Sequence, residues 1–124
     1  ITKDNYYLDL ANKTAESSLK YFFNSKTGIM KYEGTGDGGL FGGIFVRYLT
    51  QLALITRDEA IINTLVKNAE VVWNESRDPE TGAISPNWGS RTKSRQDLSV
   101  QLRGLKLIEA VARLEAAGLM DEEK

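Results

Sequence analysis

The chain has 124 residues, of which 41% are hydrophobic and 27% are charged, and its formal net charge is -1. This is the composition of one small globular domain. Because the chain contains neither Cys nor His, disulfides, thiolate metal sites, His-based triads and His metal ligands are excluded. The absence of a broad positive field argues against nucleic acid as a partner. No apolar run approaches the roughly 20 residues of a membrane span, and we expect no cofactor or metal.

Four segments carry apolar residues at helical spacing, which predicts an all-α chain. The first helix is expected over residues 4–23. The second, over residues 43–55, is apolar almost all round and should be buried on most sides. A capping box, Thr56-Arg57-Asp58-Glu59, predicts the start of the third helix. The fourth follows a similar cap, Ser94-Arg95-Gln96-Asp97, and is expected to end near Ala117, just before Gly118.

Two connections, residues 24–42 and 76–93, are much longer than the turn between the second and third helices. Up-and-down packing places both long loops at the same end of the helices. Long ordered loops in a compact domain are usually functional, so we expect a ligand at that end. Residues 34–39 formally fit the pattern G-x-G-x-x-G, but no strand precedes them, and a flexible loop is favoured over a dinucleotide site.

The sequence contains an internal repeat. Thr27-Gly28 recurs 54 positions later as Thr81-Gly82, and Arg47-x-Leu49 matches Arg103-x-Leu105 at an offset of 56. This order predicts two copies of one αα-hairpin, each with an amphipathic outer helix, a loop and a more apolar inner helix. Helical repeats stack because one unit cannot cover its own apolar face. Two copies form only an arc, so we expect them to belong to a closed toroid or a solenoid. The chain also opens at Ile1 without a start Met or a leader, which predicts a cut-out from a longer product.

The run Leu40-Phe41-Gly42-Gly43-Ile44-Phe45-Val46-Arg47-Tyr48-Leu49 resembles a segment of glycoside hydrolase family 76, the endo-α-1,6-mannanases. Further along, Asn68-Ala69-Glu70, Trp73, Arg77-Asp78-Pro79, Thr81-Gly82 and Trp88 resemble the next helix and loop of that family. The departure is Gly42, where the family pattern has a basic residue, which puts any substrate contact from that position in doubt.

This resemblance implies an (α/α)6 toroid in which residues 1–124 form a single helical fragment, the C-terminal third of the catalytic domain. It also implies a parent that hydrolyses α-1,6-linked mannan outside the cell or at its surface. The catalytic centre of the family is a pair of adjacent aspartates in the N-terminal part, and no Asp-Asp pair occurs in this sequence. The chain alone is therefore expected to be inactive, and no catalytic residue is assigned to it.

Aromatic side chains on loops are candidates for sugar binding because flat sugar faces stack on rings. The substrate-binding candidates are Tyr32, Phe41 and Trp88, with Asn87 and Arg91 beside Trp88 to bond hydroxyls. The alternative for Phe41 and Trp88 is that they close the top of the helical core.

Other polar residues have structural interpretations. Among the loop acids, Asp78 is read as a turn former and Asp97 as a helix cap, whereas Glu33 and Asp37 can reach a sugar hydroxyl. Arg47 lies inside an apolar helix, so we expect a buried salt bridge to Glu16 or Glu70. Trp73 is expected in the core.

A second functional class accounts for the same helices: a non-enzymatic helical-repeat module that docks a protein. Either way, an arc cut from a ring exposes apolar helix flanks, and we expect self-association through them.

Overall fold

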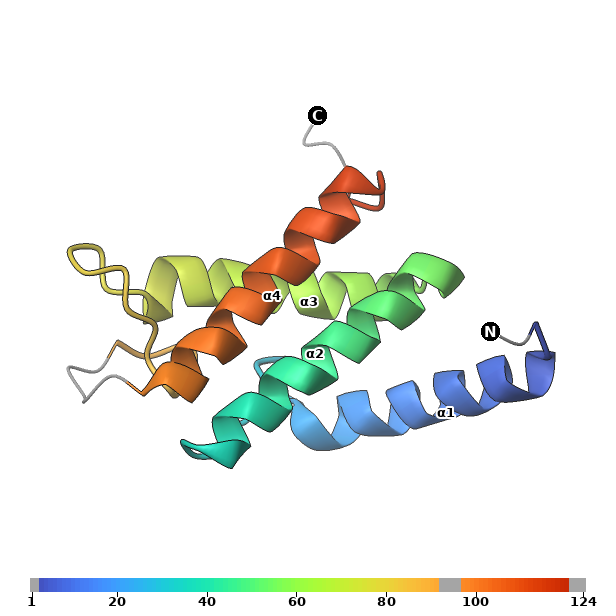
Figure 1. The fold of residues 1–124 in the computed structure, drawn as a ribbon, viewed down its shortest axis with the longest axis horizontal. Coiled ribbons are helices and arrows are strands. Elements are labelled where there is room, and N and C mark those ends of the chain that lie inside the picture. The colour runs from blue at the N-terminus through green and yellow to red at the C-terminus, as the bar shows by residue number, and fades with distance from the viewer. Residues whose placement is uncertain (1–2, 92–96, 121–124) are drawn as a thin grey trace.

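The computed structural model describes residues 3–91 and 97–120, and these residues form helices and loops without a β-strand. The elements are α1 (Asn5–Phe22), α2 (Asp37–Thr56), α3 (Glu59–Val71), the π-helical turn η1 (Val72–Ser76) and α4 (Leu98–Ala116). The predicted all-α fold is confirmed (Figure 1).

Helices α2 and α4 lie side by side and run in the same direction, and they share the most extensive contact in the molecule (Figure 1). α3 crosses behind them and contacts both, whereas α1 contacts α2 and extends away from the other helices. The two long connections lead into the N-terminal ends of α2 and α4, which lie together, since Gly39 near the start of α2 meets Ser99 near the start of α4. Both long loops therefore lie at one end, called the loop end below.

Three helices begin at an aspartate whose carboxylate accepts backbone N–H groups of the first turn. Asp4 accepts from Tyr6 at 2.9 Å, and Asp97 accepts from Ser99 at 2.9 Å. For α3 the cap is Asp58, which accepts from Ala60 at 2.8 Å, so the capping box predicted from Thr56 is wrong. Thr56 is the last residue of α2. Its hydroxyl donates to a carbonyl of its own helix.

Residues 94–96 of the other predicted cap lie outside the described residues.

α2 begins six residues earlier than predicted, at Asp37 rather than Gly43. The flexible loop predicted over residues 34–39 is therefore wrong from Asp37 onward, although Gly weakens a helix interior. Close packing outweighs that preference. A Cβ at Gly39 would lie 2.6 Å from the Ser99 hydroxyl, and one at Gly42 would lie 2.6 Å from Nε of Arg103. These glycines let the α2 backbone approach α4.

The repeat is present in the backbone hydrogen bonds of the two loops. In the first, the N–H of Asn24 donates to Ile29 and that of Gly28 to Asn24; in the second, Asp78 donates to Ala83 and Gly82 to Asp78. Single antiparallel bridges, Phe23 to Met30 and Arg77 to Ile84, close the two loops. All these pairs are offset by 54 positions, as predicted from Thr-Gly.

The inner helices follow a different offset. Their N-caps, Gly36 and Asp97, are 61 positions apart, and so are the two buried residues Val46 and Leu107. The predicted match of Arg47 with Arg103 at 56 is therefore wrong, because the second loop is seven residues longer. In the correct register Arg103 corresponds to Gly42.

The core lies between α2, α3 and α4 and is closed at the loop end by Met30, Ile84 and Trp88. α2 is not buried on most sides as predicted: Ile44 is 50% exposed and Tyr48 63% exposed. Trp73, which was expected in the core, is 52% exposed.

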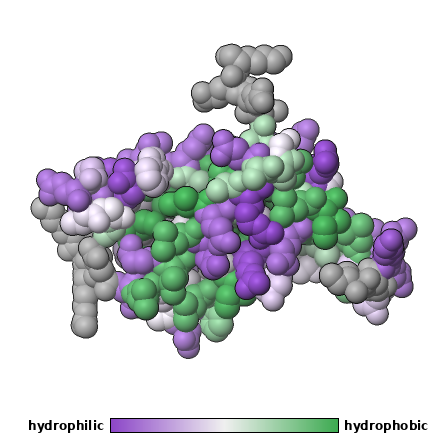
Figure 2. Space-filling model, turned by 45° about the horizontal axis from the view of Figure 1, so that its top comes forward, coloured by the Kyte–Doolittle hydropathy of each residue, from purple (hydrophilic) through white to green (hydrophobic). Residues whose placement is uncertain are grey.

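Figure 2 shows hydrophobic surface interrupted by a band of hydrophilic side chains. Within the described residues, α2 alone is long and apolar enough to span a membrane; its packing against α4 and the presence of Arg47 fit a core helix equally well.

Candidate functional site

The loop end contains an open groove of about 380 Å³ between the end of α1, the first long loop and the start of α2. It is lined by Phe22, Glu33, Gly38, Phe41 and Phe45. Phe22 and Phe45, both half-buried, pack with their ring centroids 5.3 Å apart. Phe41 is 62% exposed, and the Glu33 side chain is also exposed. An exposed ring beside a carboxylate can stack on an apolar ligand face while accepting hydrogen bonds from its hydroxyls.

The five predicted sugar-binding residues are not brought together. Phe41 lines the groove, and Tyr32, next to Glu33 in sequence, is 51% exposed. Trp88 is 5% exposed and belongs to the core cluster, which matches the alternative interpretation of this residue. Asn87 is exposed, and Arg91 donates to the Asn74 carbonyl at 2.9 Å beside η1. Sugar contact by these five residues stays a prediction.

Arg103 is the residue at this end that the sequence reasoning missed. Its side chain is buried at 2% exposure on α4. The guanidinium lies 4.5 Å from the centroid of the Trp88 ring, and its Nη2 donates to the Lys31 carbonyl at 3.0 Å. Burial lowers the pKa of Arg103, and the nearby Glu33 carboxylate acts in the opposite direction. The signal was available, because Arg103 lies four residues before the buried Leu107, on the same face of the helix.

Three buried donors at the loop end have no hydrogen-bond partner among the described residues: Nε of Arg77, Nε of Arg103 and the indole Nε1 of Trp88. Two of them, on Arg103 and Trp88, lie where the inner helices meet the loops, and the guanidinium packs over the Trp88 ring there. Gly42 makes this arrangement possible, because a side chain there would occupy the space of the guanidinium. The basic residue that the resemblance led us to expect at position 42 is absent, and the charge of Arg103 lies against that position instead.

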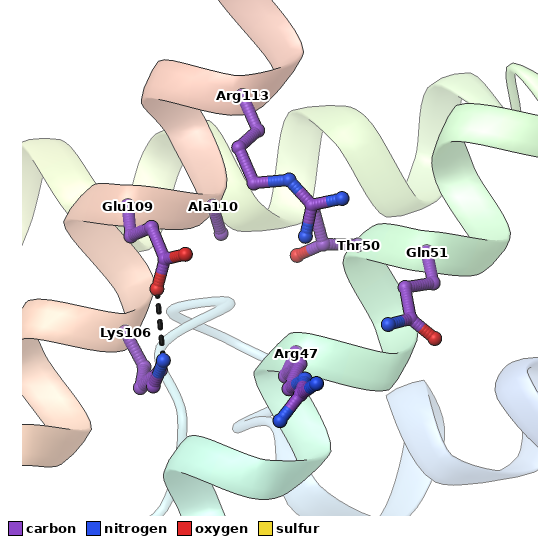
Figure 3. Close-up of a pocket in the computed structure, with 7 residues that line it drawn as sticks. All are labelled: Arg47, Thr50, Gln51, Lys106, Glu109, Ala110 and Arg113. Atoms are coloured by element: carbon purple, nitrogen blue, oxygen red, sulfur yellow. Dashed lines mark hydrogen bonds and ion pairs between the residues drawn. The ribbon is translucent and has the colours of Figure 1, made fainter.

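The predicted buried salt bridge of Arg47 is wrong. Arg47 is exposed, and no ion pair joins it to Glu16 or Glu70 within residues 3–91 and 97–120. The helix carries it on the face away from α3, where Arg47 borders a second groove (Figure 3).

This second groove, of about 320 Å³, lies between the middle parts of α2 and α4. Its lining residues are Arg47, Thr50, Gln51, Lys106, Glu109, Ala110 and Arg113. Lys106 and Glu109 form an ion pair at 3.0 Å, which lowers the pKa of Glu109. With three cations and one carboxylate the groove is positively charged. The described part of the chain holds no cluster of three or more potential metal-binding acids.

Comparisons with protein families and with solved structures point to the same family. The family model described as glycosyl hydrolase family 76 matches residues 1–123. The structure superimposes on the GH76A α-1,6-mannanase from Salegentibacter sp. HEL1_6 with a TM-score of 0.82 and 39% identity, over 91% of this chain and 35% of the mannanase. An inactive variant of that mannanase, with two adjacent aspartates changed to asparagine, was solved with α-1,6-mannotriose, and it matches with a TM-score of 0.81.

The Lin0763 protein from Listeria innocua matches with a TM-score of 0.85 and 32% identity, over 99% of this chain and 34% of Lin0763. No curated protein matches the chain. The chain thus spans about a third of the length of the solved structures that it resembles.

Proposed function

The chain belongs to glycoside hydrolase family 76 and has the fold of part of an α/α toroid enzyme, and from this premise we propose that it forms one wall of the substrate groove in an α-1,6-mannan hydrolase. The observation that carries the proposal is the 39% identity over 91% of the chain to a mannanase whose inactive variants were solved with α-1,6-mannotriose and with α-1,6-mannotetraose. Identity at this level supports a shared substrate class for the corresponding third of the fold.

The groove at the loop end is the part of this chain that we propose for mannan. Phe41 offers an exposed ring for the C–H face of a mannose unit, and Glu33 offers acceptors for its hydroxyls. The groove has no second acid among its lining residues, whereas glycoside hydrolysis uses two carboxyl groups across the scissile bond. We therefore assign binding, not bond cleavage, to this wall.

The chemistry is proposed to reside in the other two-thirds of the parent fold. The Salegentibacter enzyme is inactive when two adjacent aspartates are replaced, and the present sequence contains no such pair. The purified chain should accordingly release no reducing ends from α-1,6-mannan. Turnover above a buffer blank would show that the reacting carboxyl groups lie within these 124 residues.

Binding is tested separately from turnover. Adding α-1,6-mannotriose to the ¹⁵N-labelled chain should shift amide resonances around Phe41, and Phe41→Ala should weaken binding about tenfold, the effect of losing one stacked ring. Tyr48→Ala is the matched control, because this exposed aromatic residue of α2 does not line the groove. A helical-repeat docking module, the alternative function, predicts no response to mannotriose in any variant.

Two further expectations remain proposals. We place the parent protein outside the cell or at its surface. We also expect the chain to self-associate through apolar residues of α4, of which Leu98 is 73% exposed and Leu105 56% exposed. Sedimentation velocity over a hundredfold concentration range checks the second expectation, and a constant monomer would contradict it.

A further inference from the structure

We propose that Arg103 is a positioning residue for the mannan groove, that it fixes the first loop so that Glu33 faces the ligand, and that Gly42 is required because it leaves room for the guanidinium. This inference rests on the proposed function, since it assigns to Glu33 the role of binding sugar hydroxyls. It adds two residues, Arg103 and Gly42, that do not line the groove themselves.

Arg103 lies between the two loops. The side chain starts on α4, crosses to α2 at Gly42 and ends with Nη2 bonded to the carbonyl of Lys31, two residues before Glu33. Its other face packs on Trp88 of the second loop. One buried side chain thus contacts both loops and both inner helices. A charged hydrogen bond of this kind contributes more to holding a backbone segment than a neutral one.

Among the described residues, Tyr32 and Glu33 of the first loop have little other backbone support. After the bridge at Met30, no backbone hydrogen bond outside the helices is made by Tyr32 or Glu33 in the part of the chain that the structure describes. The Glu33 carbonyl lies close to Gly38, where a Cβ would be 2.1 Å from it, so this segment packs tightly on the start of α2. The bond from Arg103 to the Lys31 carbonyl is a charged polar contact on this segment, and further along the loop the Gly36 N–H bonds the Asp97 carboxylate.

The buried charge of Arg103 also links this residue to Glu33. A buried guanidinium is unfavourable unless an opposite charge or good hydrogen bonds compensate it. Within the described residues no ion pair includes Arg103, and its Nε has no partner. Glu33 is the one carboxylate that influences it, and Glu33 lines the groove. Attraction between the two charges favours a position of the exposed Glu33 carboxylate on the side of the loop that faces Arg103.

The central experiment displaces the guanidinium without removing it. In Gly42→Ala the new methyl group would lie 2.6 Å from Nε, so the flexible Arg103 side chain must move. The matched control is Gly43→Ala, whose Cβ would make ordinary contacts of 3.4 Å and 3.5 Å. Arg103→Lys keeps the charge but loses the planar group that bonds Lys31 and stacks on Trp88. We expect Gly42→Ala and Arg103→Lys to weaken α-1,6-mannotriose binding about tenfold, and Gly43→Ala to leave it within twofold.

A double-mutant cycle distinguishes a role of Arg103 in positioning Glu33 from a merely structural role. If Arg103 acts through Glu33, then Glu33→Gln should weaken binding about tenfold, and adding Gly42→Ala to Glu33→Gln should weaken it less than twofold more. Equal weakening by Gly42→Ala with and without Glu33→Gln would overturn the proposal. So would wild-type affinity in both Gly42→Ala and Arg103→Lys.

A measurement without sugar keeps this inference distinct from the proposed function. ¹⁵N order parameters of Tyr32 and Glu33 should fall in Gly42→Ala from rigid values of about 0.85 to below about 0.6, whereas those of Thr81 in the second loop should not change. If the wild-type chain does not bind mannotriose, the proposed function fails, and the order parameters still decide whether Arg103 positions the loop. Unchanged order parameters would refute that positioning.

Discussion

The two long loops share one backbone turn, which is held by a different side chain in each. In the first loop the N–H of Met30 donates to Asn68 on α3, and in the second the N–H of Ile84 donates to Gln101 on α4. The loops are offset by 54 positions, and so are these two donors. Repetition of the turn therefore does not require repetition of the residue that anchors it. One requirement is shared: a side-chain amide must satisfy a backbone N–H at the buried end of the loop.

The inner helices of the two repeats also have different side chains at equivalent positions. At equivalent positions α2 has Gly42 and α4 has Arg103, and the space freed by the first is filled by the second. A repeat with identical residues could not pack like this, because two large side chains would meet. The difference between the repeats is thus concentrated at the loop end, next to the groove.

The largest expected effect comes from removing the side-chain amides that anchor the two loops. Asn68 is 1% exposed and also donates to the carbonyls of Gly28 and Thr64, whereas Gln101 is half-buried and bonds Ile84 twice. Asn68→Ala should lower the free energy of unfolding by about 3 kcal/mol, because buried partners lose their bonds, and Gln101→Ala by about 1 kcal/mol.

Urea unfolding followed by circular dichroism measures both values. Equal losses in the two variants would mean that the loops contribute alike despite the difference in burial.

Sequence reasoning predicted the parts of this fold that depend on local pattern. Apolar spacing located four helices, and Thr-Gly located the repeated turn, since Gly28 and Gly82 both adopt a positive φ (70° and 76°). The resemblance pointed to the family to which the chain belongs.

What failed depended on packing between segments distant in sequence. The start of α2 was missed because Gly39 and Gly42 disfavour a helix locally, although contact with Ser99 and Arg103 requires them. Arg47 and Arg103 both interrupt apolar helices, but Arg103 is buried on the face of α4 that carries Leu107, whereas Arg47 is exposed. The groove was anticipated only as a location, at the end with the long loops.

The second prediction concerns one glycine in each of the inner helices α2 and α4. Gly43 and Gly104 occupy equivalent positions, but a Cβ at Gly104 would lie 2.4 Å from Cδ1 of Ile84. Gly104→Ala should therefore destabilise the chain by about 2 kcal/mol, because overpacking outweighs the better helix propensity of Ala. Gly43→Ala meets only ordinary contacts and should stabilise it by about 0.5 kcal/mol. Thermal unfolding of both variants is the check, and the same sign for the two would contradict the difference in packing at these glycines.

The smallest expected effect is on the loss of stability at low pH. Asp78 accepts the N–H groups of Thr81 and Glu80, which lowers its pKa from the ordinary value of 3.8. A carboxyl whose pKa is lower in the folded state contributes stability above about pH 4, and that contribution is lost as the pH falls through the folded pKa. In the first loop Asn24 accepts the equivalent bonds from Lys26 and Thr27 without titrating.

Exchanging these two residues tests whether the turns are interchangeable. Asp78→Asn should keep the turn, because an amide oxygen accepts the same N–H groups, and should reduce the loss of stability between pH 7 and pH 3. Asn24→Asp should increase that loss by giving the first loop its own carboxylate. Urea titrations at the two pH values measure both changes. If neither exchange alters the pH dependence of stability, the N–H bonds to position 78 do not favour the charged form of that carboxyl. The two loops would then differ in more than the side chains that anchor them.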